Sequence, residues 1–182
     1  MKGIFVAVVG PSGAGKDSVM REVQRLSPNV TIARRVITRQ VSDVTEESEG
    51  VDQQEFLRRA NSGAFALSWQ AHGLSYAIPA TVSNDLARGR HVLANISRRM
   101  VGDSKHCFKP CLVVMITAPI DVLAARIATR GRETADDIAV RLARAEDPDP
   151  GTLDLVIDNT GALEEAAKKL LAVLPQPSNA NL

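Results

Sequence analysis

A glycine-rich segment at residues 10–17, Gly-Pro-Ser-Gly-Ala-Gly-Lys-Asp, constrains this chain more than any other feature. It contains the pattern G-x-x-x-x-G-K, and it lies between an apolar run at residues 3–9 and a segment at 15–26 with apolar residues at helical spacing. Glycines let the backbone turn its N–H groups toward an anion, and the N-terminus of a helix adds partial positive charge. The segment therefore predicts a phosphate-binding loop (P-loop) between a buried strand and a helix.

The predicted loop assigns a role in ATP binding to a continuous run of residues: Gly10, Pro11, Ser12, Gly13, Ala14, Gly15, Lys16, Asp17 and Ser18. Lys16 is expected to reach the β- and γ-phosphates of ATP and to be catalytic. The structural alternative is a glycine-rich turn between a strand and a helix that binds no ligand.

Asp17 departs from the usual form of the motif, which has Ser or Thr after the lysine as a ligand of Mg²⁺. A carboxylate beside a triphosphate is repelled unless a cation lies between them. We therefore expect Asp17 to bind Mg²⁺, directly or through water. The alternative is an aspartate in the first turn of a helix that only favours the helix dipole.

Strands and helices are predicted to alternate along the chain, and only 3% of the residues are aromatic, so Val, Ile, Leu and Ala must form the core. This pattern is typical of a parallel sheet covered on both faces by helices. We predict an α/β fold with a doubly wound parallel sheet, namely the P-loop nucleoside-triphosphate hydrolase fold of the nucleotide-kinase type, with an arginine-bearing lid. Residues 1–175 are expected to form one kinase domain, and residues 176–182 a frayed tail.

Three segments have weaker local patterns. Residues 40–52 are acidic and contain few apolar side chains, which favours a solvated loop. Residues 64–78 are expected to form short irregular strands. Pro79 is predicted to begin a helix that ends near Gly89, because proline is well tolerated in a first helical turn.

Overall charge argues against several classes of partner. The formal net charge is +1, which provides no global field for nucleic acid and no polybasic segment for a membrane surface. The N-terminal apolar run leads directly into the glycine loop, so we read it as a strand and expect a cytoplasmic protein. Cys107 and Cys111, with His106 nearby, match no common zinc spacing and are expected to be two buried or half-buried thiols at the start of a strand.

An arginine cluster follows at a distance suited to a lid over the phosphates. Arg130, Arg132 and Arg141 are expected to be catalytic, because phosphoryl transfer requires positive charge around the migrating group. Gly131 makes a hinged, closing segment plausible. Arg126 and Arg144 are assigned instead to the surface or to ion pairs, and a solvated surface is the alternative for each arginine of the cluster.

From Gly3 to about Ala167 the chain resembles guanylate kinase and its relatives. The resemblance rests on the P-loop, Thr38-Arg39, the block from Gly63-Ala-Phe65 through His72-Gly73 to Tyr76 and Pro79, the arginine lid, and Asp158-Asn-Thr-Gly161. It implies that Arg39 and Tyr76 hold a phosphate of the acceptor. It also implies that Asn159 lies beside the adenine of ATP.

The departures from that family affect the acceptor. Leu67 stands where guanylate kinases have the glutamate that recognises guanine, Ser42 stands where they have a second phosphate-binding arginine, and Asn95 and Ser97 stand in place of an acidic pair. Without the carboxylates, the N–H groups of a bound guanine would lose their partners. We therefore expect an acceptor without a purine base.

One branch of the family, the ribose 1,5-bisphosphate phosphokinases of bacterial phosphonate degradation, is similar to this chain at these same positions, including Asp17 and Leu67-Ser-Trp69. The resemblance implies transfer of a phosphoryl group from ATP to ribose 1,5-bisphosphate, a small sugar phosphate, to give 5-phosphoribosyl 1-diphosphate. The expected acceptor-binding residues are Arg39, Tyr76, Arg98, Trp69, His72 and Asn95. Structural roles are the alternatives for Arg98 on a surface helix, for Trp69 in the core, and for His72.

Two further functions remain open at this point. One is a guanylate kinase or another P-loop kinase of small metabolites. The other is a non-catalytic binding module on the same scaffold, which is disfavoured because Lys16 and the lid arginines are present. The sequence leaves the oligomeric state undetermined.

Overall fold

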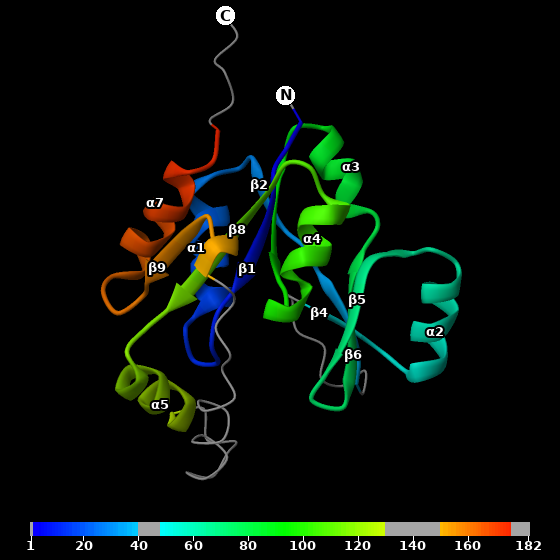
Figure 1. Ribbon diagram of the computed structural model, residues 1–182, viewed down its shortest axis with the longest axis horizontal. Helices are drawn as coiled ribbons and strands as arrows, with labels where there is room; N and C mark the ends of the chain where they lie inside the picture. Colours follow the sequence, from blue (N-terminus) through cyan, green and yellow to red (C-terminus); the bar gives the residue numbers. More distant parts are fainter. Residues whose placement is uncertain (1, 40–47, 130–149, 176–182) are drawn as a thin grey trace, which may run out of the picture.

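A five-stranded parallel sheet forms the centre of the protein in a computed structural model that describes residues 2–39, 48–129 and 150–175 (Figure 1). Its strands, in spatial order, are β2 (Val30–Ile32), β7 (His91–Asn95), β1 (Phe5–Val9), β8 (Cys111–Thr117) and β9 (Leu155–Asp158). Every neighbouring pair is parallel. All five residues of β1 are buried, as a central strand with both faces covered requires. The predicted α/β fold with a parallel sheet is confirmed.

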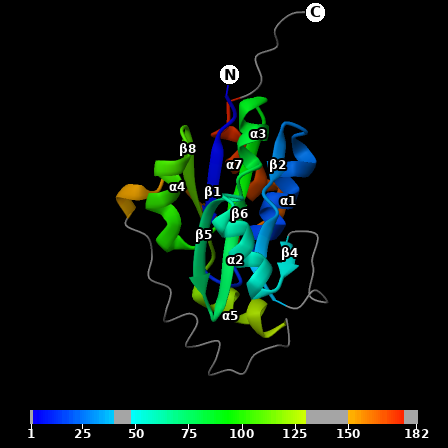
Figure 2. The ribbon, with the colours of Figure 1, turned by 90° about the vertical axis from the view of Figure 1, so that its right-hand side faces the viewer.

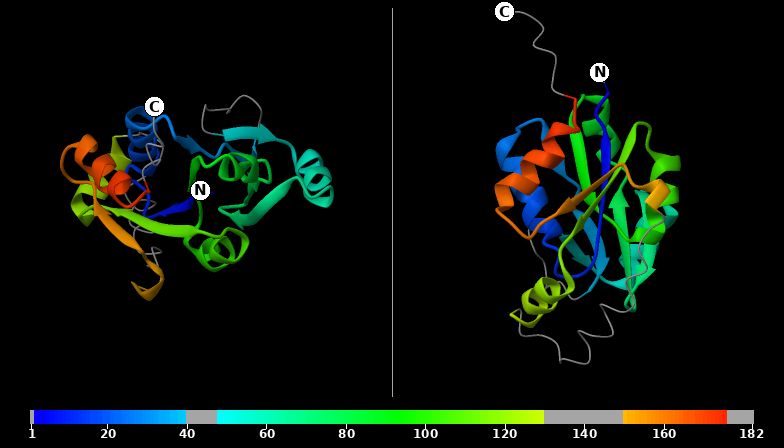
Figure 3. Two further views of the ribbon diagram at one scale, coloured as in Figure 1. Left: turned by 90° about the horizontal axis from the view of Figure 1, so that it is seen from above. Right: turned by 60° about the vertical axis from the view of Figure 1, so that its left-hand side comes forward.

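Helices α1 (Lys16–Leu26) and α7 (Leu163–Ala172) cover one face of this sheet. Val19 and Met20 of α1 and Leu170 of α7 join Val6 and Val8 of β1 in one buried cluster. The opposite face packs against α3 (Val82–Ala87), α4 (Val101–Cys107) and a second sheet. Figure 3 shows the two layers of helices on either side of the strands.

The second sheet has four strands in the order β4 (Ser48–Val51), β3 (Arg35–Thr38), β6 (Leu74–Pro79) and β5 (Phe65–Ala71). Helix α2 (Gln53–Asn61) packs on its outer side, where the ring of Phe56 lies 4.9 Å from that of Phe65 (Figure 2). Asp52 caps α2 by accepting a hydrogen bond from the N–H of Glu55 at 2.7 Å.

Two local predictions were wrong in this region. Ser48–Val51 is a strand rather than part of a solvated loop, because it pairs with β3 and buries Gly50 and Val51. Pro79 ends β6 instead of beginning a helix, since it lies opposite Phe65 of β5, and α3 begins only at Val82. Residues 64–78, expected to form short irregular strands, contain most of an antiparallel hairpin formed by β5 and β6. Its register shifts once, between Phe65 and Leu67.

The remaining elements flank the parallel strands. Helix α5 (Ile120–Ala128) follows β8 and lies at the lower end of Figure 1, below the sheet. The short 3-10 helices are η2 (Arg98–Met100), directly after β7, and η3 (Pro150–Thr152), before β9. Of the helices in the described ranges, none has the length and apolar character needed to cross a membrane.

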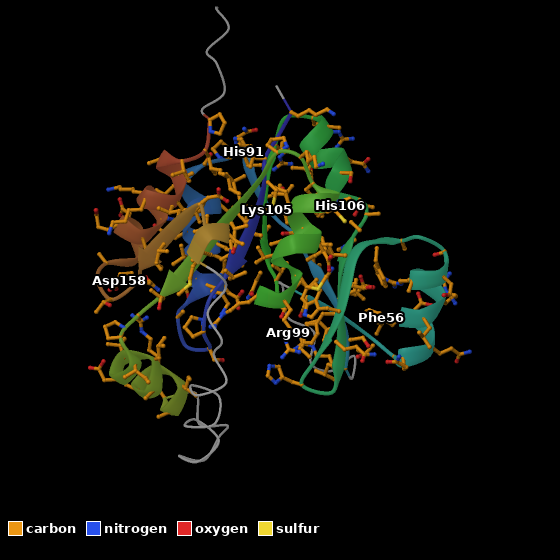
Figure 4. All side chains as sticks on the ribbon, in the orientation of Figure 1. Phe56, His91, Arg99, Lys105, His106 and Asp158 are labelled. Atoms are coloured by element: carbon orange, nitrogen blue, oxygen red, sulfur yellow. The ribbon has the colours of Figure 1, made fainter. Side chains whose placement is uncertain are left out.

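His91 joins three elements at the opposite, upper end of the sheet (Figure 4). Its side chain is 5% exposed, its Nδ1 accepts the N–H of Ile4 at 3.1 Å, and its Nε2 lies 3.0 Å from the carbonyl oxygen of Pro175. Because Nδ1 is an acceptor, the neutral ring carries its proton on Nε2 and donates it to Pro175. The residue therefore links β7 to the approach to β1 and to the segment after α7.

Replacement of His91 by leucine is expected to lower the free energy of unfolding by about 1–3 kcal/mol, because a buried N–H and a carbonyl lose their partner. Urea denaturation followed by circular dichroism measures the change. The matched control is His106→Leu at an exposed position of α4, which should shift the free energy by less than about 0.5 kcal/mol. Equal effects of the two substitutions would contradict this role of His91.

Candidate active site

The P-loop connects the end of β1 to the start of α1, as predicted, and its glycines are required by close contacts. Gly10 has φ 141°, and a Cβ there would lie 2.0 Å from the carbonyl oxygen of Ile116 on β8. Gly15 has φ 82°, and a Cβ there would lie 2.5 Å from Nδ2 of Asn159. Gly15 is also the N-cap of α1 and has no side chain that would occupy the first amide groups of the helix. These amides are suited to bind an anion.

Lys16 lies over the beginning of the loop. Its ammonium group donates hydrogen bonds to the carbonyl oxygens of Gly10 and Pro11, both at 2.9 Å. Lys16 is the only basic side chain among residues 10–17. A positive charge at the start of the loop is suited to neutralise a bound phosphate.

Asp17 and Asn95 face each other between α1 and β7. The Nδ2 of Asn95 donates a hydrogen bond to Oδ1 of Asp17 at 2.8 Å, and both side chains are half-buried. In the described ranges, no group of three or more His, Cys, Asp or Glu residues is placed to hold a metal ion. One carboxylate beside a phosphate loop nevertheless fits Mg²⁺, which often binds one protein carboxylate together with phosphate oxygens of the substrate.

Asn159 supports the P-loop from behind. Its side chain is 5% exposed and donates a hydrogen bond from Nδ2 to the carbonyl oxygen of Ala14 at 2.8 Å. The side-chain and backbone groups of Thr160 donate to Asp158, which lowers the pKa of that carboxyl group and closes the turn after β9. The contact of Asn159 with adenine, which the resemblance implies, remains a prediction.

Arg126 is the residue of this region whose role the sequence did not reveal. It was assigned to the surface or to an ion pair, but it is half-buried and donates from Nη2 to the carbonyl oxygen of Asn159 at 2.8 Å. Its Nη1 is buried and has no hydrogen-bond partner among the described residues. No local pattern marks this contact, because Arg126 and Asn159 lie 33 positions apart.

Three of the expected acceptor-binding residues come from neighbouring strands of the second sheet. Trp69 and Tyr76 lie directly opposite each other on β5 and β6, and their rings stack with centroids 5.5 Å apart and an interplanar angle of 9°. Arg39 follows β3 and donates from Nη2 to the hydroxyl of Ser48. Within the described part of the chain, the Nε of Arg39 is buried and has no hydrogen-bond partner.

Leu67 is part of the core. Its side chain is 5% exposed and packs with Ile78 and Val82 in the cluster beneath the second sheet. This position, where the resemblance implies that guanylate kinases have the glutamate that recognises guanine, is therefore filled by an apolar contact. The site lacks both a carboxylate and an open space at residue 67.

Besides Asn95, which contacts Asp17, two expected acceptor residues lie outside the strands of the second sheet. His72 is exposed in the turn of the β5–β6 hairpin, where it and Gly73 have φ values of 52° and 74°. Two consecutive residues with positive φ are typical of a tight hairpin turn, which supplies a structural reason for this sequence. Arg98 is half-buried and begins η2, just after the carboxyl end of β7.

The predicted lid lies outside the described residues. Its residues Arg130, Arg132, Arg141 and Arg144 fall within 130–149, and Ser42 of the acceptor region falls within 40–47, a second range outside the described residues. The two cysteines are free thiols. Cys107 is exposed at the end of α4, where a buried or half-buried position was expected, and burial raises the pKa of the half-buried Cys111 thiol.

The parallel sheet and the loop at its carboxyl edge define a P-loop kinase fold of the guanylate-kinase type. The solved structure of guanylate kinase from Anaplasma phagocytophilum superposes on the chain with a TM-score of 0.70, covering 94% of this chain and 84% of that one at 20% sequence identity. No protein-family model matches the chain.

Curated relatives are much more similar in sequence. Ribose 1,5-bisphosphate phosphokinase PhnN from Acidiphilium cryptum is 50% identical over 94% of this chain and 92% of the relative, and the enzyme of that name from Brucella melitensis is 46% identical over 93% and 91%. The chain belongs to the ribose 1,5-bisphosphate phosphokinase family.

Proposed function

We propose that this protein transfers the γ-phosphoryl group of ATP to ribose 1,5-bisphosphate, forming ADP and 5-phosphoribosyl 1-diphosphate in phosphonate catabolism. The observation that carries the proposal is the 46–50% identity to enzymes named for this acceptor over nearly the whole chain. The buried Leu67 supports it, because a sugar bisphosphate needs no base-recognising carboxylate.

An oxygen of the acceptor's 1-phosphate attacks the γ-phosphorus in this reaction, and the bond from that phosphorus to the β,γ-bridging oxygen breaks. The attacking oxygen is already anionic, so no strong general base is required. Catalysis then depends on alignment and on neutralisation of charge. Bound Mg²⁺ would neutralise charge on the β- and γ-phosphates. Lys16 adds positive charge from the loop, and we assign the same task to Arg130, Arg132 and Arg141.

The acceptor is proposed to bind on the second sheet beside the P-loop. Arg39, whose Nε is a buried donor without a partner in the described ranges, and Tyr76 would hold one phosphate of the bisphosphate. Arg98 would hold the other, and Trp69 and His72 would contact the sugar. Asn159 would lie by the adenine of ATP. For Asn95 the hydrogen bond to Asp17 favours a role at the metal rather than a direct contact with the acceptor.

A phosphorus NMR assay tests the reaction directly. The protein is incubated with ATP, Mg²⁺ and ribose 1,5-bisphosphate, and in parallel with gluconate, shikimate or ribose 5-phosphate. We expect ADP to accumulate together with a diphosphate bonded to the sugar only when the 1,5-bisphosphate is present. Preferential phosphorylation of another acceptor would reject the proposed substrate. ATP binding without turnover on any acceptor would favour a binding module instead.

A further inference from the structure

Asp17 and Asn95, the two polar side chains that meet beside the P-loop, have an unusual distribution of charge. P-loop enzymes generally hold Mg²⁺ with the hydroxyl of the Ser or Thr that follows the lysine and with an aspartate elsewhere in the fold. In this chain the residue after the lysine is Asp17, and β7, the parallel neighbour of β1, ends with the neutral Asn95. The two side chains are joined by the 2.8 Å hydrogen bond from Nδ2 of Asn95 to Oδ1 of Asp17.

We infer that the two roles are exchanged in this protein: Asp17 supplies the carboxylate for Mg²⁺ from the P-loop, and Asn95 is the neutral residue that positions it. The inference rests on the proposed function only for its donor, a nucleoside triphosphate with Mg²⁺. Either arrangement places one carboxylate and one neutral polar group beside the phosphates. In this chain the carboxylate comes from the first turn of α1 and the neutral group from the end of β7.

Sheet register places Asn95 for this task. Asn95 lies opposite Val8 of β1, two positions before the loop begins at Gly10, and Asp17 is in the first turn of the helix that follows the loop. The side chain of Asp17 makes no other hydrogen bond or ion pair within the described residues. With Oδ1 held by the amide, its second oxygen is left for a cation.

An aspartate that only favours the helix dipole needs neither a hydrogen-bond partner on β7 nor an oxygen free for a cation. Asp103 provides the comparison, because it is also in the first turn of a helix, α4, and it is exposed. If Asp17 had the same role as Asp103, its replacement would leave the affinity for metal unchanged. The inferred role predicts instead that loss of the carboxylate at residue 17 lowers the affinity for metal, and that a new carboxylate at residue 95 restores it.

Four variants separate these possibilities: Asp17→Ser, Asn95→Leu, the double variant Asp17→Ser with Asn95→Asp, and the control Asp103→Ser. The affinity of each for a non-hydrolysable ATP analogue is measured by isothermal titration calorimetry with excess Mg²⁺ and again with EDTA. The ratio of the two dissociation constants reports the metal's contribution to binding. Thermal unfolding of each variant verifies that it is folded at the temperature of the titration.

Asp17→Ser is expected to reduce this ratio about tenfold or more, and Asn95→Leu about tenfold, as is typical when a residue that orients a ligand is lost. The double variant should return to within about threefold of the original ratio, because it restores a carboxylate on β7 that can accept a hydrogen bond from the new hydroxyl on α1. Asp103→Ser should leave the ratio unchanged.

An unchanged ratio in Asp17→Ser would overturn the inference, and so would a double variant no better than Asp17→Ser alone. The titrations contain no sugar acceptor. Rejection of ribose 1,5-bisphosphate as the substrate would therefore leave this result intact, and failure of the exchange would leave the acceptor assay intact.

Discussion

Replacement of Lys16 by alanine is expected to lower kcat for phosphoryl transfer by about a thousand-fold or more while the fold is retained. The ammonium group of Lys16 is the only positive side-chain charge within residues 10–17. It donates hydrogen bonds to the carbonyl oxygens of Gly10 and Pro11, both at 2.9 Å. Charge that develops at the β,γ-bridging oxygen in the transition state would lose its nearest partner from the loop.

An assay coupled to formation of ADP, with saturating ATP and acceptor, measures this loss. The matched control is Lys169→Ala, which removes an exposed lysine from α7 and should keep the original rate. Circular dichroism should show the same secondary structure for both variants. A Lys16→Ala protein with a near-normal kcat would show that the P-loop is not the catalytic centre.

The protein is expected to discriminate strongly between acceptors: kcat/KM for GMP should be about a thousand-fold below that for ribose 1,5-bisphosphate. Each N–H of guanine left without a partner costs roughly 1–3 kcal/mol, so two losses produce a change of this size. Two side chains in the structure disfavour guanine binding. Leu67 is packed into the core, and the amide of Asn95 is already hydrogen bonded to Asp17.

The same coupled assay, run with each acceptor under identical conditions, gives the two values of kcat/KM. Ribose 5-phosphate serves as a comparison, because it lacks the 1-phosphate that is proposed to attack ATP and should give little turnover. Comparable values for GMP and ribose 1,5-bisphosphate would return the protein to the nucleotide kinases.

Features that depend on neighbouring residues were predictable from the sequence. The P-loop is contiguous, so its position between β1 and α1 followed from one motif and its flanking patterns. The apolar runs of β1, β7 and β8 predicted a buried parallel sheet, since strands covered on both faces consist almost entirely of apolar residues. The lid arginines were predicted from their charge and spacing, and the acceptor-binding residues from resemblance; both sets remain predictions.

Elements of the second sheet were predicted less well. Ser48–Val51 contains Ser, Glu and Gly and has no strand pattern of its own, yet it pairs with β3. Pro79 is equally compatible with a first helical turn and with the end of a strand, and pairing with β5 decided between them. Strand propensity depends strongly on the neighbours that a strand packs against, which are distant in the sequence.

The chemistry of the donor site can be read from consecutive residues: a glycine-rich phosphate loop, one lysine, and a carboxylate where a hydroxyl is usual. The groups that surround these residues are known only from the fold. The amide of Asn95 meets Asp17 across 78 positions, and the side chain of Asn159 reaches the loop at Ala14 across 145. These contacts arise because the loop follows the central strand, and the ends of β7 and β9 lie at the same edge of the sheet. No local pattern encodes that meeting, since it is created by the order of the strands.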